Sequence, residues 1–367
     1  MVFYDPRGVV QNYVVTLLKS FETIVDDLII VVNGDIQVEE KHKLEEYSTS
    51  LFIRENSGFD AGAYKDVFIE FCKEYNWEDY EELLLFNDTF YGPFFSWERI
   101  FDEMMAKEVD FWGLSRHQGS KGEYVEKTEI TEHIQSYFIL IRKNMFLHPS
   151  FMAFWDKLEY SQTLEETVAK FEIFFTKYFK ERGFKYTSWT DILNVMYGAK
   201  MDTDYRKLNA SIIGSDFPIL KRKECTLLNY VFTKECVLNI TETTDYPISY
   251  IIEDTEIRNK LRNSEPIKID QLLQFCTTHK KLYIYGNGAY AKNIQAFLND
   301  NGINIEANIV SDDQRQQENT VKFSDFKLEK DSGIIIALGK KNLQEVIKRI
   351  EEKFMQEQIF RPQFEMK

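Results

Sequence analysis

Residues able to bind a nucleotide or a metal ion follow short apolar runs near the start of the chain. The runs at residues 28–32, 51–53 and 83–86 are followed by polar or small residues, which are Asn33, Gly34 and Asp35, then residues 54–58, then Asn87, Asp88 and Thr89. Short, bounded apolar runs of this kind are typical of buried strands. Ligands of open α/β sheets bind outside the carboxyl ends of the strands, so we expect these side chains to form one active-site crevice.

Small residues stand where the run at 51–53 passes into a helix. Gly58 and Gly62 bracket Asp60, and a helix start at this place would offer unpaired N–H groups to a phosphate close to the backbone. The alternative is an ordinary helix start capped by Ser57 or Asp60. The three polar strand ends that share one crevice favour the nucleotide site.

The order of strands and helices around these tips can be read from the apolar pattern. Residues 2–4 end a first strand, residues 10–24 carry a helical apolar stripe, and residues 61–75 form a helix between the strands at 51–53 and 83–86. This order indicates a mostly parallel sheet. Aromatic residues at helical spacing in residues 146–179 indicate core rather than a carbohydrate platform.

Composition limits the classes of function. Lys and Arg total 45 against 60 for Asp and Glu, a net charge of -15, which argues against nucleic acid as a partner. Four cysteines without paired spacing indicate reduced thiols. The pattern of neither a membrane span nor a signal peptide is found, so we expect a soluble cytoplasmic protein.

Six ordered blocks resemble one known family. DPRGVV from Asp5, VVNGD from Val31, RENSGFDAGAYK from Arg54, LLLFNDTFYGPF from Leu83, DFWGLSRH from Asp110 and HIQSYFILIRK from His133 resemble the rhamnan synthesis protein F family. These bacterial polysaccharide-assembly proteins are regarded as rhamnosyltransferases. The resemblance covers about residues 1–224 and extends more distantly to GT-A glycosyltransferases. It implies an α/β fold with a GT-A-like, mostly parallel sheet domain and transfer of a sugar from a nucleotide-sugar donor.

Such a donor leaves as a diphosphate, whose charge a cation must stabilise. By the resemblance, Asn87 and Asp88 occupy the metal position, where Mg²⁺ or Mn²⁺ is expected; one carboxylate departs from the usual two but is permissible. Arg54 and Lys65 could carry part of that charge instead, although Lys65 is equally explained as a solvated helix residue.

The resemblance also places residues around the nucleotide. Asp5, Asn33 and Asp35 stand where GT-A proteins hold the base and ribose, and Asn56, Gly58 and Asp60 line the same crevice. For the first three, the alternative is a turn residue that bonds its own backbone.

A general base is expected late in the domain. Asp191 in SWTDILN stands just before a helix, where inverting GT-A enzymes often place a carboxylate that accepts the acceptor's proton. The alternative is that Thr190 or Asp191 caps that helix. His117, at a strand tip, is the rival base.

Basic residues close this domain in FPILKRK, residues 217–223. They could reach a lipid-linked acceptor or an anionic membrane surface, or simply end the domain, since three charges fall below the usual lipid-binding cluster. Residues 225–270 are expected to form a helical connector.

A second α/β unit is expected at residues 271–367, a small Rossmann-like domain. Gly286, Gly288 and Ala291 match GxGxxA after a strand, and Asp312 follows the next strand. The unit is short and lacks a Tyr-x-x-x-Lys dyad, so we expect close packing or a small phosphate ligand, not NAD-dependent redox chemistry.

Together these observations predict an inverting glycosyltransferase. It would add a deoxyhexose, rhamnose from dTDP-rhamnose, to a lipid-linked glycan acceptor of a bacterial cell-surface polysaccharide, in the cytoplasm or at the inner face of the cytoplasmic membrane. The alternatives are an NAD-linked sugar dehydrogenase or epimerase, and a non-catalytic glycan-assembly protein.

Overall fold

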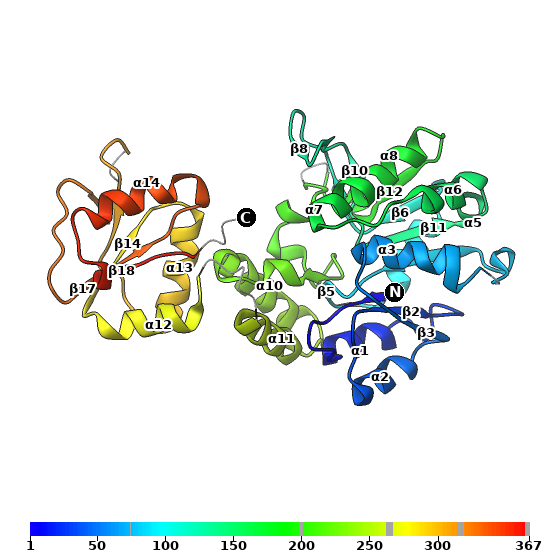
Figure 1. The fold of residues 1–367 in the computed structure, drawn as a ribbon, viewed down its shortest axis with the longest axis horizontal. Coiled ribbons are helices and arrows are strands. Elements are labelled where there is room, and N and C mark those ends of the chain that lie inside the picture. The colour runs from blue at the N-terminus through cyan, green and yellow to red at the C-terminus, as the bar shows by residue number, and fades with distance from the viewer. Residues whose placement is uncertain (74, 199–200, 262–266, 315–316, 318, 364–367) are drawn as a thin grey trace. The chain divides into compact units, whose positions relative to one another are not determined.

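The computed structural model describes residues 1–73, 75–198, 201–261, 267–314, 317 and 319–363. The chain divides into two compact units (Figure 1). Unit 1 comprises residues 1–221 and 239–250, and unit 2 comprises residues 222–238 and 251–367. The predicted connector at 225–270 has residues in both units, and its residues 262–266 lie outside the described residues.

Unit 1 is built on two sheets that meet at its centre. One has the order β1-β2-β3, the other has the order β12-β6-β11-β4, and the parallel bridge Val2–Asn87 joins β1 to β4. All pairings are parallel except those made by β11. The strands are β1 (Val2–Phe3), β2 (Ile29–Asn33), β3 (Ser50–Arg54), β4 (Glu82–Phe86), β6 (Phe111–Gly113), β11 (Phe138–Arg142) and β12 (Tyr186–Ser188).

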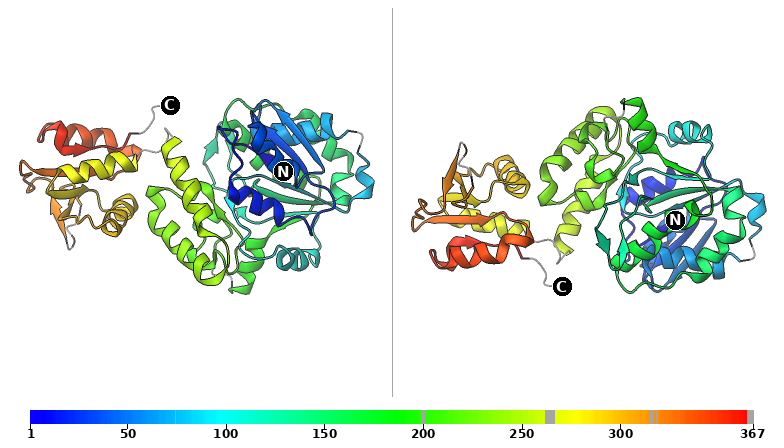
Figure 2. Two further views of the ribbon diagram at one scale, coloured as in Figure 1. Left: turned by 90° about the horizontal axis from the view of Figure 1, so that it is seen from below. Right: turned by 90° about the horizontal axis from the view of Figure 1, so that it is seen from above.

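Helices cover both faces of this sheet. Figures 1 and 2 show α1 and α2 on one side and α3, α6 and α8 on the other. The helices are α1 (Asn12–Lys19), α2 (Val38–Glu45), α3 (Phe59–Asp66), α4 (Glu98–Met105), α5 (Lys143–Phe146), α6 (Pro149–Lys157), α7 (Leu164–Thr167), α8 (Phe174–Lys180) and α9 (Trp189–Met196). Two π-helical segments, η1 (Val67–Phe71) and η3 (Val168–Ile173), continue α3 and precede α8.

Short elements complete unit 1. The small strands are β5 (Phe90–Tyr91), β7 (Arg116–His117), β8 (Tyr124–Val125), β9 (Thr128–Glu129), β10 (His133–Ile134) and β13 (Leu220–Lys221). Of these, β5 pairs with β13, and β7 pairs with β10. The single-turn helices are η2 (Trp77–Asp79), η4 (Tyr205–Lys207) and η5 (Ala210–Ile212).

The core of unit 1 is strongly aromatic. Trp155, Phe171, Phe175 and Phe179 are all buried in one cluster with strand residues such as Ile139. The prediction that residues 146–179 supply core is therefore confirmed. Helix α2 was not predicted, because it carries no apolar stripe and buries Leu44 alone.

Unit 2 contains a five-stranded parallel sheet of order β16-β15-β14-β17-β18. The strands are β14 (Lys281–Tyr285), β15 (Ala307–Val310), β16 (Thr320–Lys322), β17 (Ser332–Ile336) and β18 (Ile359–Phe360). The helices of this region are α10 (Tyr230–Thr243), α11 (Ile248–Leu261), α12 (Ile269–Thr278), α13 (Ala289–Asp300) and α14 (Lys340–Glu351), with short turns η6 (Arg222–Glu224), η7 (Leu227–Asn229) and η8 (Gln356–Gln358).

The predicted fold class is confirmed in both units. Each has helices packed on a largely or wholly parallel sheet, and the strand and helix of the GxGxxA segment form as β14 and α13. Among the described residues, no helix has the length and apolar character needed to span a membrane.

Candidate active site

The centre of the unit 1 sheet has a reversal of strand order. From β1 the chain passes through α1 to β2 on one side, whereas β4 lies on the other side of β1, joined by the bridge at Asn87. Ligands of open α/β sheets bind outside the carboxyl ends of the strands at such a reversal. Asn87 and Asp88 stand at this edge, and the start of α3 brings Asp60 to them.

Asp60 faces the tip of β4 from the first turn of α3. Its Oδ1 accepts the N–H of Ala61 at 2.9 Å, and its Oδ2 accepts Nδ2 of Asn87 at 3.1 Å. Burial, and then the negative charge of Glu172, raise the pKa of Asp60 to about 6 in spite of these hydrogen bonds. A carboxyl group with this pKa can exchange a proton near neutral pH.

The tip of β4 is held in place by its neighbours. Oδ1 of Asn87 accepts the N–H of Thr89 at 3.2 Å and its hydroxyl at 2.6 Å. The hydroxyl of Tyr13 lies 3.2 Å from both the backbone oxygen and Oδ2 of Asp88, whose side chain is buried. The carboxylate of Asp88 therefore has a fixed position beside Asn87.

One buried hydroxyl beside these carboxylates lacks a partner. The Tyr64 hydroxyl has no hydrogen-bond partner among the described residues, although the side chain is buried. Burial, and then the negative charges of Asp60 and Asp88, raise the pKa of Tyr64 well above its ordinary value. Buried polar groups are normally hydrogen-bonded, so a ligand oxygen or a water molecule fits this place.

A polar cluster around one further carboxylate, that of Glu172, lies near enough to Asp60 to affect its pKa. Oε2 of Glu172, in η3, accepts the N–H of Ser136 at 2.9 Å and its hydroxyl at 2.6 Å, while Oε1 lies 3.6 Å from Nε2 of His133. Burial alone would raise the pKa of Glu172. Interactions with His133, Lys221 and Ser136 outweigh burial and hold this pKa well below its usual range.

Polar side chains from β13 and from the segment before β11 border this cluster. Nζ of Lys221, on β13, lies 3.7 Å from the ring centroid of Tyr137, and the Ser115 hydroxyl contacts the Tyr137 hydroxyl at 2.6 Å and donates to Oε1 of Gln135 at 2.5 Å. Lys221 and Gln135 are both buried. Buried charged and amide groups in such number are unusual in a core and make this cluster a candidate functional site.

The chain matches the family described as rhamnan synthesis protein F over residues 28–359, which is most of its length. It belongs to the rhamnan synthesis protein F family.

Individual relatives are distant. The chain is 24% identical over 191 residues to the uncharacterized protein y4gN of Sinorhizobium fredii, a match that spans 51% of the chain and 47% of y4gN. The chain therefore covers about half of that relative.

Two solved structures resemble this chain weakly, each with a TM-score of 0.30. Core-mannan synthase A of Aspergillus fumigatus, in its Mn/GDP form, is 9% identical, with 52% of this chain and 72% of that chain covered and a TM-score of 0.30. A Desulfovibrio desulfuricans protein whose name proposes a nucleotide-diphospho-sugar transferase is 15% identical, with 66% and 96% covered and a TM-score of 0.30. At these scores neither likeness carries an argument about substrate or mechanism.

The structure supports helix capping, the alternative role of Asp191. Ser188 and Asp191 form a reciprocal capping box at the start of α9. Arg116 in addition binds Oδ1 of Asp191 through Nη2 at 2.6 Å and Nε at 3.2 Å. Burial would raise the pKa of Asp191, but hydrogen bonds from Arg116 and Ser188 hold it below its ordinary value. These contacts favour the capping role of Asp191 over the role of general base.

His117, the rival base, is also engaged. Its Nδ1 accepts the N–H of Gly119 at 2.8 Å, its Nε2 lies 3.5 Å from Oδ2 of Asp204, and its ring stacks on His133. Burial, and then His133, lower the pKa of His117. With both ring nitrogens occupied and little exposed surface, His117 holds the loop after β7.

Two predicted phosphate ligands have structural partners instead. The guanidinium of Arg54 is bound to Oδ2 of Asp66 at 2.5 Å, to Oδ1 of Asn33 at 2.6 Å and to the backbone oxygen of Ser57 at 2.7 Å. Nζ of Lys65 donates to the backbone oxygens of residues 156 and 158 at the end of α6. These contacts argue against both as ligands of a diphosphate.

The glycines at the start of α3 are explained by packing. Gly58 has a φ of +72°, and a Cβ there would lie 2.9 Å from the Tyr160 ring. A Cβ on Gly62 would lie 2.2 Å from the backbone oxygen of Ser57. The space expected for a ligand at these glycines is thus filled by the protein, whereas Asn56 is exposed beside them.

The three residues predicted to hold the base and ribose of a nucleotide differ in their hydrogen-bond partners and exposure. Asp5 accepts the backbone N–H and the side chain of Arg7, which is the turn role given as its alternative. Nδ2 of Asn33 donates to the backbone oxygen of Phe59 and so ties β2 to α3. Asp35 alone has an exposed side chain, and it remains a predicted ligand.

The three basic residues of FPILKRK, residues 217–223, differ in burial and in their partners. Lys221 is buried and belongs to the cluster near Glu172, and Arg222 is bound to Asp254 at 3.0 Å. Only Lys223 of the three is exposed. Of the three basic residues, Lys223 alone is therefore available for the predicted contact with a lipid-linked acceptor or a membrane surface, and that contact stays a prediction.

The glycine turn of unit 2 is tightly packed on one side. Gly286 has a φ of +124°, and a Cβ there would lie 2.7 Å from the backbone oxygen of Ala337, whereas a Cβ on Gly288 would meet open space. Asp312, placed to bind a ribose, accepts the N–H of Ser324 at 2.8 Å instead. Close packing thus explains Gly286, and absence of NAD-dependent chemistry stays a prediction.

Proposed function

We propose that the chain is a glycosyltransferase that uses a nucleotide-sugar donor and binds it at the carboxyl edge of the unit 1 sheet. Membership of a rhamnan synthesis family supports sugar transfer. The observation that carries the assignment of the site is the approach of Asp60 to Asn87 beside Asp88, at the reversal of strand order. It brings a titratable carboxyl and a fixed carboxylate to one crevice.

Asp88 serves the donor in this proposal. The carboxylate of Asp88 and the hydroxyl of Tyr64, which has no hydrogen-bond partner within the part of the chain that the structure describes, offer oxygen ligands that fit a hard cation such as Mg²⁺ or Mn²⁺. Asp88 would hold the cation, and donor phosphate oxygens would supply further ligands, since Mg²⁺ commonly takes only one or two protein carboxylates. The cation would stabilise the charge on the departing diphosphate.

Asp60 replaces Asp191 as the proposed base. In its ionised form it accepts the proton of the acceptor hydroxyl while that oxygen attacks the anomeric carbon and the bond to the nucleoside diphosphate breaks. One such displacement inverts the configuration. Glu172 does not contact the reacting atoms in this proposal; its negative charge raises the pKa of Asp60 and so positions the proton transfer near neutral pH.

The proposed donor sugar and acceptor rest on the description of the family. A rhamnan synthesis protein favours a deoxyhexose donor, dTDP-rhamnose, and a growing bacterial cell-surface polysaccharide on a lipid carrier as acceptor. A lipid-linked acceptor would bring the enzyme to the inner face of the cytoplasmic membrane.

A panel of nucleotide-sugars tests the proposal. The full chain is incubated with dTDP-rhamnose, UDP-glucose and GDP-mannose, with Mg²⁺, Mn²⁺ or EDTA, and release of nucleoside diphosphate is measured against Asp88→Asn. We expect release from dTDP-rhamnose that falls at least tenfold in the variant. Absence of both binding and turnover for every donor, with a folded protein, would contradict the proposal and favour a non-catalytic assembly role.

A further inference from the structure

The proposed donor site needs positive charge beyond one divalent cation. A nucleoside diphosphate carries several negative charges, and protein sites balance them with metal ions, cationic side chains or helix N-termini. Arg54 and Lys65, which were predicted for this role, are held by side chains and backbone oxygens of unit 1. Another cationic side chain is therefore expected at the carboxyl edge of the sheet.

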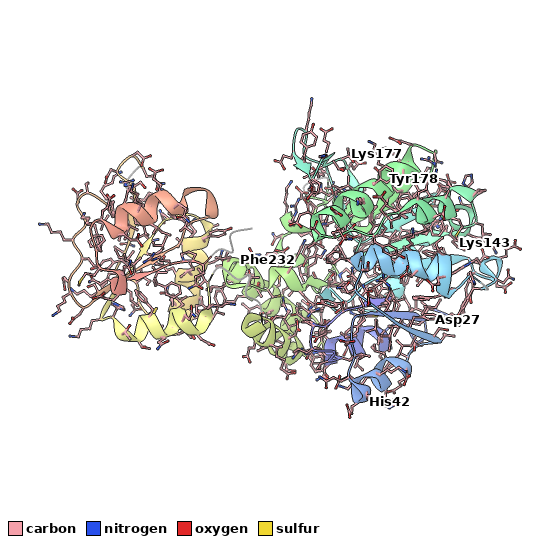
Figure 3. All side chains as sticks on the ribbon, in the orientation of Figure 1. Asp27, His42, Lys143, Lys177, Tyr178 and Phe232 are labelled. Atoms are coloured by element: carbon pink, nitrogen blue, oxygen red, sulfur yellow. The ribbon has the colours of Figure 1, made fainter. Side chains whose placement is uncertain are left out.

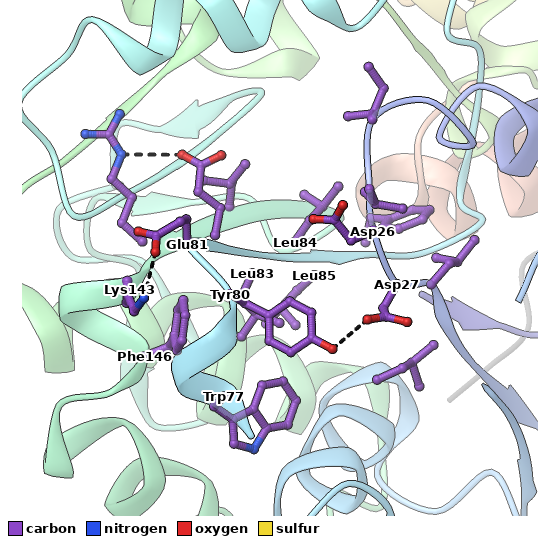
Figure 4. Close-up of a pocket in the computed structure, with 18 of the residues that line it drawn as sticks. Asp26, Asp27, Trp77, Tyr80, Glu81, Leu83, Leu84, Leu85, Lys143 and Phe146 are labelled. Atoms are coloured by element: carbon purple, nitrogen blue, oxygen red, sulfur yellow. Dashed lines mark hydrogen bonds and ion pairs between the residues drawn. The ribbon is translucent and has the colours of Figure 1, made fainter. Parts of the chain in front are cut away.

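A cavity of about 950 Å³ at the opposite, amino edge of the same sheet does not suit a diphosphate. Its lining includes seven carboxylate side chains and two basic ones, Arg142 and Lys143. Both basic side chains are already paired, Lys143 with Glu81 at 2.6 Å and Arg142 with Glu82 at 3.7 Å. Figure 4 shows the pair of Lys143 with Glu81. An anion would therefore meet mostly negative charge in this cavity.

The pairing of two short strands brings Lys221 to the carboxyl edge. β13 is antiparallel to β5, and Lys221 is opposite Phe90, which follows Asp88 by two residues. Nζ of Lys221 lies 3.7 Å from the centroid of the Tyr137 ring, and the ring of Phe90 also contacts that ring, with centroids 5.9 Å apart. The backbone oxygen of Tyr137 accepts the N–H of Asn87 at 3.3 Å. Lys221 is thus linked to the end of β4 both by strand pairing and through Tyr137.

The charge of Lys221 is buried beside Glu172. Lysine is seldom buried without an anionic neighbour, and the pKa of Glu172, which burial alone would raise, is lowered chiefly by His133 and further by Lys221. Oε2 of Glu172 accepts the N–H and the hydroxyl of Ser136, and Oε1 faces Nε2 of His133 at 3.6 Å. Both oxygens of Glu172 therefore have neighbours that hold them without Lys221, and the lysine charge can serve a further anion.

We propose that Lys221 binds the diphosphate group of the nucleotide-sugar donor, an inference that rests on the proposed function. Its ammonium group donates to oxygens of the phosphate nearest the sugar, because negative charge develops there when the bond to the sugar breaks. Lysine binds phosphate in this way, as a compact positive charge. Asp88 holds the metal ion from the end of β4, and Lys221 reaches the same diphosphate from β13. Two positive charges then balance the diphosphate at a site with one metal-binding carboxylate.

Binding of nucleotides without a sugar tests this role separately from catalysis. Calorimetry on the full chain in Mg²⁺ gives the Kd of dTDP and dTMP, of UDP and UMP, and of GDP and GMP. For the pair that binds most tightly, Lys221→Met should weaken the diphosphate at least tenfold and the monophosphate less than threefold. A purely structural role of Lys221 would weaken both nucleotides alike.

Two further variants keep the test independent of folding. Lys221→Met combined with Glu172→Gln removes two interacting charges together, and it should show the same loss of preference for the diphosphate. Lys177→Met removes one positive charge from an exposed position on α8, labelled in Figure 3, and should leave both Kd values within twofold of wild type. The Tm of each variant reports whether it is folded.

The outcomes separate the role of Lys221 from the proposed function. If the wild type binds a diphosphate and the folded variants lose affinity equally for both nucleotides, or lose none, the role of Lys221 alone is overturned. If the folded wild type binds no nucleotide, both this role and the donor site are overturned.

Discussion

Two helix starts in unit 1 each present a carboxylate after a strand, and the two carboxylates differ in every respect that matters for proton transfer. Asp191, at the start of α9, is bound by Arg116 and by the capping serine, and its pKa is lowered. Asp60, at the start of α3, meets an amide and a neighbouring negative charge, and its pKa rises to about 6. The partners of a carboxylate, and not its position before a helix, decide whether it can act as a base.

The largest effect is expected from Asp60→Asn. Asn keeps the size of the side chain and can still accept the N–H of Ala61, but it cannot take up the acceptor's proton. Turnover should therefore fall about 10²- to 10⁴-fold while donor affinity changes little. The measurement is kcat and KM for diphosphate release. Turnover within threefold of wild type would remove Asp60 from the mechanism.

The pH dependence of kcat/KM should report the ionisation of Asp60. In the proposed mechanism Asp60 acts in its ionised form, so kcat/KM should fall about tenfold for each pH unit below about 6 and level off above it. The residual activity of Asp60→Asn should lack this inflection. An inflection near pH 4 in the wild type would instead point to a carboxyl group with an ordinary pKa.

Asp191→Ala should affect stability and not chemistry. The variant loses the capping box and leaves Arg116 without its main partner, at a cost of about 1–2 kcal/mol. For a unit of this size the expected loss of Tm is about 2–8 °C. Thermal unfolding checks the shift, and turnover of the folded fraction at 25 °C serves as the control that should stay near wild type.

The smallest effect is expected from Asp191→Asn. The Oδ1 atom of Asn can still accept the backbone N–H of Ser188, so the capping box should be kept and activity should stay within about twofold of wild type. Assayed beside Asp60→Asn, this variant gives the sharpest contrast between the two helix starts. A large loss of turnover with unchanged stability would restore Asp191 as the base and contradict the comparison.

The sequence predicted what depends on local pattern. The apolar runs at 28–32 and 83–86 are strands, residues 146–179 supply core, and the polar ends of β2 and β3 meet through Asn33 and Arg54. The roles of individual side chains depend on distant partners. Arg54 binds Asp66 and Asn33, and Lys65 binds the end of α6, contacts that no local pattern indicates.

Sequence reasoning missed the roles of Glu172, Gln135 and Lys221. Glu172 is a single charged residue inside the aromatic stretch FEIFF, whereas Gln135 and Lys221 stand beside other polar residues, in HIQSY and LKRKE. The available signal was that a charged residue in such a stretch needs a buried partner. Identifying the partner required the tertiary fold, because Ser136 and His133 reach Glu172 from another element.

Because Glu172 lies in the π-helical segment η3, its position depends on the number of residues in that segment. A π turn holds one residue more than an α-helical turn, so it changes the rotational phase of everything that follows it. Phe171 and Ile173 are buried on either side of Glu172 in this segment. A deletion of one residue within Val168–Ile173 that restored a regular helix would rotate the carboxylate by about 100° away from Ser136, since an α-helix has 3.6 residues per turn. In the evolution of such a chain, gain or loss of a single residue could switch this site on or off while every side chain type is kept.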